Sequence, residues 1–481
     1  MAIQNLVRDE DKFFSDLAKF ALELKKRENI VVIFHHDADG VSSGAIAIKA
    51  LTRLGKNVKN LCLKQLYKEN ISQIKELGST FLFVDFGSGQ LDYLKEDLGE
   101  DSVFILDHHQ PLKENNKEIK MKWHINPLLY GIDGGNELSG AGTTFYFALV
   151  LDKKNSDLSV LAIIGALGDM MDYTGSLKGL NREIIKIAEE EKLLTKKIDL
   201  RLYGRISRPL VSYLSFASSP ILPNLTAQQD NCINFLNGLD IKLKDSHGNY
   251  KSYEDLVEEE KRKLSSALIM HLNNFGIDEW KIKELIGEVY TIEKENKKSP
   301  LRDAKEFATL LNACGRNKKT DIALAVCLGD RDPFGEYGKA LSMLQIHREN
   351  LRAGIEFVQK NGVTEKKNFY LFDAKNEIDE SIVGIIAGML YGSVINETKP
   401  IIALAQNSDG TIKLSGRATS SLVRKGINLG GAFKEIGKKI EGVEGGGHKI
   451  AAGCKIPKEK KDEFLESLEK ILESQMSVGK N

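Results

Sequence analysis

The sequence predicts an α/β protein with a doubly wound parallel sheet. Short runs of β-branched and aromatic residues, such as those at 30–34, 81–84 and 103–106, alternate with polar stretches long enough to form a helix. This alternation is typical of buried parallel strands joined by helical crossovers, and continuous apolar runs indicate strands covered on both faces. At 481 residues the chain can form further cores. We therefore also expect a smaller C-terminal α/β domain and a mixed inserted domain.

The elements of the first domain, residues 1–200, follow from the spacing of their apolar residues. Apolar residues recur every three or four positions in the predicted helices and are continuous in the predicted strands. This spacing predicts strands over 30–35, 58–63, 80–84 and 102–106. It predicts helices over 9–27, 40–54, 72–77, 91–98, 141–152, 157–167 and 180–193.

The pattern changes over residues 201–300, where we expect the inserted domain with mixed-charge helices over 253–270 and 280–286. The polar stretch that ends at Pro300 predicts a linker, because proline stops regular structure. Residues 301–360 are expected to form connecting helices. The last domain, residues 361–481, alternates strands and helices again, with strands over 368–372, 401–405 and 412–415 and a glycine loop before a final strand.

The composition limits the partners that the whole chain can attract. Lys plus Arg and Asp plus Glu number 68 each, so the formal net charge is zero and nucleic acid would have to bind in a local groove. The five cysteines lack the spacing of a thiolate metal site, which favours reduced thiols in a cytosol. No apolar stretch reaches membrane-spanning length, so we expect a cytoplasmic protein without a membrane partner.

Histidines and carboxylates follow three of the predicted strands, at the point where each strand ends. The carboxyl ends of parallel strands meet at one edge of a sheet, where open α/β sheets bind ligands. Asp169 follows the apolar run 161–168 and is expected to join the same crevice. The strand-end residues are His35, Asp37 and Asp39, then Asp85, then Asp107, His108 and His109.

This cluster predicts a site for two divalent ions. Several carboxylates and imidazoles without a nearby cysteine suit Mn²⁺ or Mg²⁺ better than a tetrahedral zinc site. One ion would not need so many ligands, whereas two ions about 3.5–4 Å apart can share a carboxylate and activate a water for attack on phosphorus. Asp85 is the only ligand-type residue at its strand end, which makes it the natural bridge.

A second polar cluster lies near the C-terminal end. The consecutive glycines Gly445, Gly446 and Gly447 allow backbone N–H groups to approach a phosphate closely, and His448 adds a donor. Arg417 can offer a two-pronged hydrogen bond to the same phosphate, with a structural salt bridge as its alternative role.

In their order along the chain, these motifs resemble the DHH phosphoesterase superfamily, and specifically its RecJ-like archaeal nuclease branch. The stretch 301–316 is similar to a segment of that branch. The C-terminal cluster is similar to the accessory substrate-binding domain of such nucleases, called DHHA1. The four N-terminal motifs are matched by His35-x-Asp37-x-Asp39-Gly40, Asp85, Asp107-His108-His109 with Asn126-Pro127, and Gly168-Asp169.

The resemblance implies a role for each residue. Bacterial RecJ proteins usually carry an aspartate where this chain has His35, so the chain departs from them there. Asp107 and His109 would act in catalysis, with His109 facing the substrate. One ion would be held by His35, Asp37 and Asp85, and the other by Asp39, Asp85, His108 and Asp169.

The resemblance also implies an activity. An exonuclease of this kind would use two Mn²⁺, or Mg²⁺, to hydrolyse single-stranded DNA from 5′ to 3′, and also RNA, in replication or repair. The insert would dock the replication complex GINS, and Tyr213, Phe216 and Trp280 are its expected exposed aromatics. Two other functions remain open: a phosphodiesterase for small substrates or short oligonucleotides, and a non-catalytic subunit of a replication complex.

Overall fold

The computed structural model divides into two compact units. The first comprises Met1–Leu214 with Ile233–Leu344, and the second comprises Ser215–Cys232 with Gln345–Asn481. The structure describes residues 8–114, 117–217, 220–226, 228–391, 394–407 and 409–478. Within these ranges, no helix is both long and apolar enough to cross a membrane.

The first unit is built on a five-stranded parallel sheet, which confirms the predicted fold class. The strand order is β2-β1-β3-β4-β7. Neighbouring strands in this order are paired in parallel throughout. The chain leaves β1 toward β2 on one side, and β3 lies on the other, so the end of β1 is a topological switch point. The strands are β1 (Asn29–His35), β2 (Asn57–Leu63), β3 (Phe81–Val84), β4 (Val103–Leu106) and β7 (His124–Ile125).

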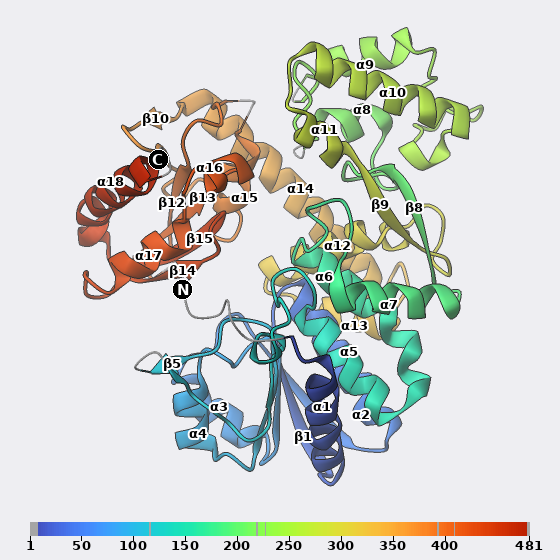
Figure 1. Ribbon diagram of the computed structural model, residues 1–481. Coiled ribbons are helices and arrows are strands. Elements are labelled where there is room, and N and C mark those ends of the chain that lie inside the picture. Colours follow the sequence, from blue (N-terminus) through green and yellow to red (C-terminus); the bar gives the residue numbers. More distant parts are fainter. Residues whose placement is uncertain are drawn as a thin grey trace. The chain divides into compact units, whose positions relative to one another are not determined.

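Helices cover both faces of this sheet (Figure 1). Successive side chains of a strand point to opposite faces, so Val32 packs in the core on one face and Ile33 in the core on the other. The first core is formed with α1 (Glu10–Lys25), α2 (Ala38–Arg53), α5 (Gly140–Leu151), α6 (Ser159–Gly168) and α7 (Gly179–Glu190). The second is formed with α3 (Asn70–Leu77) and α4 (Leu91–Leu98). A short hairpin, β5 (Lys113–Glu114) and β6 (Lys117–Glu118), follows β4.

The helices α12 (Ala304–Arg316) and α13 (Thr320–Leu328) also belong to the first unit. The apolar side chains of α12, which the sequence places among connecting helices, are part of the same core as α2 and α6. The insert follows β8 (Leu194–Leu200), which pairs antiparallel with β9 (Ile286–Ile292). Between these strands lie α8 (Leu210–Ser215), α9 (Gln229–Gly238), α10 (Glu258–Asn274) and α11 (Glu279–Leu285).

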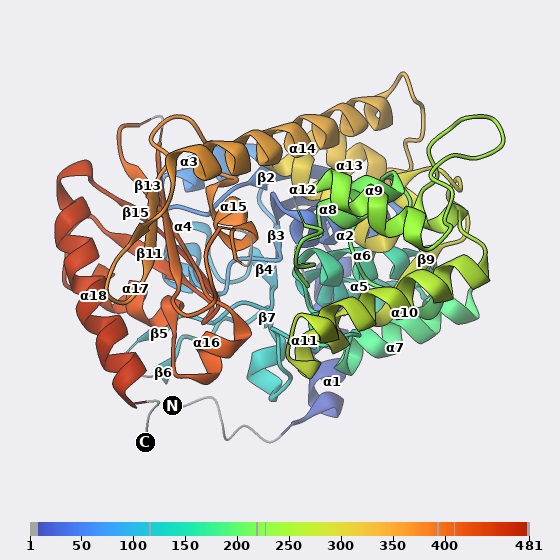
Figure 2. The same ribbon diagram turned by 90° about the horizontal axis from the view of Figure 1, so that it is seen from above.

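The second unit contains a six-stranded mixed sheet, in the order β10-β11-β12-β13-β15-β14. Figure 2 shows α17 and α18 on one side of its strands and α15 on the other. The glycine segment that was expected as a loop forms the edge strand β14. The strands are β10 (Thr364–Glu365), β11 (Tyr370–Asp373), β12 (Ile401–Gln406), β13 (Ile412–Arg417), β14 (Glu444–Gly447) and β15 (Ala451–Ile456). The helices are α14 (Glu336–Asn361), which begins in the first unit, α15 (Val383–Met389), α16 (Ser420–Arg424), α17 (Leu429–Gly437) and α18 (Lys461–Val478).

Candidate metal centre

The first group of candidate ligands lies at the switch point. His35 is the last residue of β1, and Asp37 caps the N-terminus of α2 by accepting a hydrogen bond from Gly40 N. Asp85 follows β3 directly and has a left-handed backbone, with φ of 65°. His35 Nδ1 lies 2.9 Å from Asp37 Oδ2 and 3.7 Å from Asp85 Oδ2. The ends of two neighbouring strands thus bring these three side chains together.

The second group surrounds the His108 imidazole, which is buried. Its Nε2 atom lies 3.2 Å from Asp85 Oδ1, 3.3 Å from Asp169 Oδ2 and 3.6 Å from Asp39 Oδ2. His108 Nδ1 is 2.6 Å from the Gly134 carbonyl, to which it donates its proton. A histidine held in this way keeps a lone pair on Nε2, as a metal ligand requires.

The donor atoms fit a divalent cation better than they fit one another. His35 Nδ1, Asp85 Oδ1 and His108 Nε2 are buried and make no hydrogen bond of acceptable geometry, although each lies close to a carboxylate or an imidazole. Buried polar atoms without partners are rare in folded proteins. Ligand atoms of His35, Asp37 and Asp85 lie within 4.8 Å of one another, as do those of Asp39, His108 and Asp169. Oxygen and imidazole donors in two adjacent groups suit a pair of Mn²⁺ or Mg²⁺ ions.

The electrostatics of the cluster also favour added positive charge. Burial, together with the charges of Asp85 and Asp169, raises the pKa of Asp39 well above its ordinary value. Burial likewise raises the pKa of Asp169 to about 7. Burial lowers the pKa of His108, but its carboxylate neighbours outweigh burial and raise that pKa overall. Without a cation, the folded protein can therefore hold these carboxylates together only by taking up protons.

This arrangement predicts that the metal-free protein becomes more stable as the pH falls from 8 to 5.5. The pKa values of Asp39 and Asp169 are raised in the folded state above their unfolded values near 4. Between the unfolded and the folded pKa values, the folded state binds more protons than the unfolded state, so the stability falls as the pH rises. The raised pKa of His108 acts in the same direction, because its stabilising contribution is lost as the pH rises. Thermal unfolding with chelator should give a melting temperature a few degrees higher at pH 5.5. Saturating Mn²⁺ should remove this trend, and greater stability of the chelated protein at pH 8 would contradict it.

Asp107 and His109 lie beside the two groups. Both Asp107 oxygens are occupied by donors, namely Ser88 N at 2.9 Å, His108 N at 2.7 Å, and the backbone and Nδ1 of His109 at 3.1 and 2.9 Å. The His109 side chain is 47% exposed. Asp107 therefore fixes the orientation of His109 and leaves its Nε2 free. Ligand atoms of His109, His108 and Asp85 also lie within 4.8 Å of one another.

Asn126 and His124 form hydrogen bonds beside the Asp107-His108-His109 motif. Asn126 donates from Nδ2 to the His109 carbonyl at 2.8 Å and to Ser88 Oγ at 2.9 Å. His124 is buried, and its Nε2 atom lies 2.8 Å from Ser88 Oγ. Burial lowers the pKa of His124 to about 4. His124 is thus a neutral, internal histidine.

Sequence reasoning missed two glycines on which the site depends. A Cβ atom at Gly140 would lie 2.4 Å from Asp85 Oδ1, and one at Gly165 would lie 2.2 Å from Asp39 Oδ1. Gly140 N and Ala141 N also donate to Asp39, at 2.8 and 3.0 Å. The helices α5 and α6 can approach the carboxylates this closely only without side chains at these positions. Gly140 follows no strand, and its role could not be inferred without the fold.

The helix α12 contacts two loops that carry candidate ligands, the turn of Asp37 and Asp39 and the loop after Asp169, and it was not assigned to the site from the sequence. Asn312 Oδ1 accepts a hydrogen bond of 2.9 Å from Ala38 N, between the ligands Asp37 and Asp39. Lys305 Nζ lies 2.9 Å from the buried Asp172 Oδ2, three residues after Asp169. The sequence predicts helices over 301–360, but only the resemblance of stretch 301–316 pointed to this helix in particular, and that resemblance assigned no role to any of its residues.

We expect Asn312→Ala to weaken Mn²⁺ binding by about tenfold, because outer groups that orient ligands commonly contribute this much to metal affinity. Isothermal titration with Mn²⁺ measures the change. Asn317→Ala is the matched control, since Asn317 lies at the end of the same helix and its side chain donates to Ala313 O at 2.8 Å. Equal Mn²⁺ affinities for the two variants would show that Asn312 does not position the Asp37–Asp39 turn.

The C-terminal cluster lies in the second unit, at one end of its sheet. Arg417 of β13 pairs with Ala451 of β15, and Gly447 of β14 pairs with Ala452 on the other side of the same strand. Arg417 and the glycines therefore lie two strands apart, about 10 Å. Burial lowers the pKa of Arg417, and no described carboxylate forms an ion pair with it. A half-buried guanidinium without such a partner is open to an anionic ligand.

The three glycines are not equivalent. A Cβ atom at Gly445 would lie 2.7 Å from Cys454 Cβ, and one at Gly447 would lie 2.6 Å from the Ala451 carbonyl. A Cβ atom at Gly446 would meet nothing within 4 Å. Packing within the unit thus requires glycine at two of the positions and leaves the third open. His448 is exposed beside them.

Three family models match the chain. They are the DHH family N-terminal domain over residues 29–167, the DHH-CID domain over 202–286 and the DHHA1 domain over 367–474. An uncharacterised protein of Methanocaldococcus jannaschii is 31% identical over 452 residues, 93% of this chain and 94% of that protein. The single-stranded-DNA-specific exonuclease RecJ of Bacillus subtilis is 28% identical over 196 residues, 38% of this chain and 24% of that protein.

Solved structures share the fold. RecJ from Thermus thermophilus in complex with Mn²⁺ has a TM-score of 0.59 at 18% identity, over 96% of this chain and 55% of that one. CDC45 from Entamoeba histolytica has a TM-score of 0.60 at 13% identity, over 96% and 99%. The chain thus spans about half the length of the T. thermophilus protein. With DHH, DHH-CID and DHHA1 domains in this order on a RecJ-like fold, the chain belongs to the DHH phosphoesterase superfamily as a RecJ-like member.

Proposed function

We propose that this protein is a metal-dependent exonuclease that hydrolyses single-stranded nucleic acid. The main supporting observation is that the carboxylate of Asp85 lies between the two ligand groups, near His35 of one group and near His108 of the other. Two Mn²⁺ or Mg²⁺ ions bound there would supply a hydroxide nucleophile and neutralise charge on the scissile phosphate. His35, Asp37 and Asp85 would hold one ion, and Asp39, Asp85, His108 and Asp169 the other.

His109 and Asp107 act on the substrate side of this site. The hydrogen bond from His109 Nδ1 to Asp107 Oδ1 fixes the imidazole and leaves Nε2 to hydrogen-bond a phosphate oxygen. His109 is half exposed, whereas the ligand His108 is buried. Asp107 is then a positioning residue, which acts through His109.

The second unit would bind a neighbouring or terminal phosphate. Arg417 offers the guanidinium, the open position at Gly446 allows backbone N–H groups to approach the phosphate, and His448 adds a donor. Binding of a terminal phosphate by this unit would make cleavage start at an end. We infer 5′-to-3′ polarity, Mn²⁺ as the metal and DNA as the main substrate, with a role in replication or repair.

The experiment uses oligonucleotides of DNA and RNA labelled at the 5′ or the 3′ end. We expect the 5′ label to appear at once in mononucleotides and the 3′ label in a ladder of shortening products, with Mn²⁺ and not with chelator. Cleavage of a small diester without any cleavage of oligonucleotides would favour the small-substrate alternative. Absence of both activities with two Mn²⁺ bound would favour a non-catalytic subunit.

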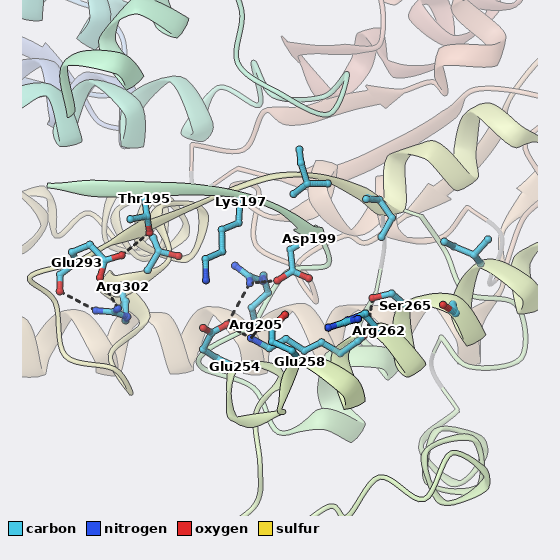
Figure 3. A pocket seen from close by; sticks show the side chains of 16 residues that line it. Thr195, Lys197, Asp199, Arg205, Glu254, Glu258, Arg262, Ser265, Glu293 and Arg302 are labelled. Carbon is cyan, nitrogen blue, oxygen red and sulfur yellow. Dashed lines mark hydrogen bonds and ion pairs between the residues drawn. The ribbon is translucent and has the colours of Figure 1, made fainter. Parts of the chain in front are cut away.

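The insert is proposed to dock GINS through a charged cavity of about 330 Å³ (Figure 3). Lys197 extends from β8 and Arg262 from α10, and neither forms an ion pair among the described residues. The cavity's carboxylates are already engaged, as Asp199 and Glu254 are by Arg205. The surplus of positive charge suits an acidic surface of the partner.

The expectation of exposed aromatics in the insert was partly wrong. Tyr213 is fully buried and packs against Tyr253, with ring centroids 5.2 Å apart. Phe216 is half-buried and belongs to the second unit. The side chain of Trp280 lies outside what the structure describes. Charge, and not an aromatic patch, therefore supports the docking proposal.

Docking is tested by a double charge reversal, Lys197→Glu with Arg262→Glu, which leaves the buried parts of the insert untouched. We expect the variant to lose co-purification with GINS and to keep its activity on short single strands. A variant that still captures GINS would rule this cavity out. Lys263→Glu with Lys283→Glu, on exposed parts of α10 and α11, is the matched control.

A further inference from the structure

The loop that follows Asp169 carries two large apolar side chains that are exposed. Met170 is 61% exposed and Tyr173 is 54% exposed. Met170 is the residue next to a candidate ligand and has a left-handed backbone, with φ of 58°. Tyr173 N donates to Met170 O at 3.1 Å, which closes a turn and holds the two Cα atoms within about 7 Å of each other. Both residues therefore belong to the short turn that directly follows the candidate ligand Asp169.

The loop is firmly anchored, so this exposure is a fixed feature of it. The two residues between the exposed ones, Met171 and Asp172, are each 2% exposed. Asp172 accepts from Lys305 Nζ at 2.9 Å and from Arg201 Nη2 at 2.5 Å. Farther along, Gly175 O accepts from Glu288 N at 2.8 Å. The loop is thus tied to α12 and to both strands of the insert's ribbon.

Such a loop presents a preorganised apolar surface beside a strongly polar site. Exposing Met170 in a left-handed conformation is unfavourable both for the side chain and for the backbone, and such strain clusters at functional sites. A phosphodiester substrate brings an apolar, flat group to this place, namely the base attached to a nucleotide at the scissile phosphate. Bases of any sequence stack on tyrosine, and methionine adapts its shape to a neighbouring ring.

We propose that Met170 and Tyr173 form a stacking subsite for the base of a nucleotide adjoining the scissile phosphate. The inference rests on the proposed nuclease function and deepens it. It gives a chain of zero net charge a contact to nucleic acid other than charge attraction. It also discriminates against substrates without a base, such as pyrophosphate.

The test combines Tyr173→Ala with single abasic sites placed in turn at the first four nucleotides of a single-stranded DNA. Removing one stacking partner should raise KM about tenfold, a typical loss for one base–aromatic stack. At the nucleotide whose base stacks on Tyr173, an abasic site and Tyr173→Ala should each raise KM about tenfold. When the variant acts on the DNA that is abasic at this position, KM should rise no further. Tyr173→Phe should restore the intact-substrate KM. Tyr250→Ala removes a side chain 61% exposed on the insert and serves as the control.

Two outcomes would overturn the inference. If Tyr173→Ala raises KM by the same factor at every abasic position, its effect is structural and independent of a base. If it changes KM on no substrate, the loop does not contact nucleic acid. Wild-type protein that leaves the intact DNA uncleaved would refute the proposed function itself, and this result is distinct from either of the two.

Discussion

Asp85→Asn should reduce hydrolysis of single-stranded DNA by roughly a thousandfold or more, because it removes a charge that two ions share. Asparagine keeps the size and shape of the side chain, so it still fits against Gly140. At that position an added Cβ atom would lie only 2.4 Å from Asp85 Oδ1. The measurement is the initial rate with Mn²⁺, together with the melting temperature of the chelated protein. Asp92→Asn, on the exposed side of α4, is the isosteric control.

The chelated Asp85→Asn protein should be no less stable than the wild type. Its amide removes one of the negative charges that raise the pKa values of Asp39 and Asp169. A variant that hydrolyses DNA at nearly the wild-type rate would refute the bridging role. A variant that unfolds would instead identify Asp85 as a structural residue.

Arg417→Ala should raise KM for single-stranded DNA by roughly a hundredfold, because a charged two-pronged hydrogen bond to a phosphate is worth about 2–3 kcal/mol. Its Mn²⁺ affinity should equal that of the wild type, since Arg417 and the ligand groups lie in different units. Arg417→Lys keeps the charge but loses the fork and should recover only part of the binding. Arg424→Ala, an exposed arginine of the same unit, is the control.

Loss of Mn²⁺ binding in Arg417→Ala would show that this arginine supports the metal site indirectly, since a guanidinium cannot itself bind a cation. An unchanged KM would leave Arg417 with a structural role, through its 2.8 Å hydrogen bond to the Gly416 carbonyl. Both measurements are independent of cleavage polarity.

The parallel sheet could be predicted because its central strands contain continuous apolar runs, as in the buried run 81–84. The strand β8 escaped prediction because its sequence Leu-Thr-Lys-Lys-Ile-Asp-Leu is largely polar and only its two end residues are buried. Tertiary pairing with β9, and not a local pattern, makes it a strand. The glycines of β14 were expected as a loop for a similar reason, since only the pairing with β15 orders them.

The candidate ligands could be predicted because each follows an apolar run that ends at one edge of the sheet. Their supporting residues could not, because these come from helices far away in the sequence. Asn312 bonds to Ala38 across 274 positions, and Gly165 makes room for Asp39 only after α6 has packed on α2. The three glycines 445–447 cannot be distinguished in the sequence. Only the packing shows that an added Cβ atom would clash at Gly445 and Gly447 but would meet no atom at Gly446.

The number of Mn²⁺ ions bound per chain tests the central claim most directly. Equilibrium dialysis with the full-length wild-type protein should give two ions, one for the group of His35, Asp37 and Asp85 and one for the group of Asp39, His108 and Asp169. Asp85→Asn should bind both ions more weakly, because Asp85 belongs to the first group and its Oδ1 atom lies 3.2 Å from His108 Nε2 of the second. A wild-type protein that saturates at one ion, with an affinity that Asp85→Asn leaves unchanged, would contradict a two-ion phosphodiesterase.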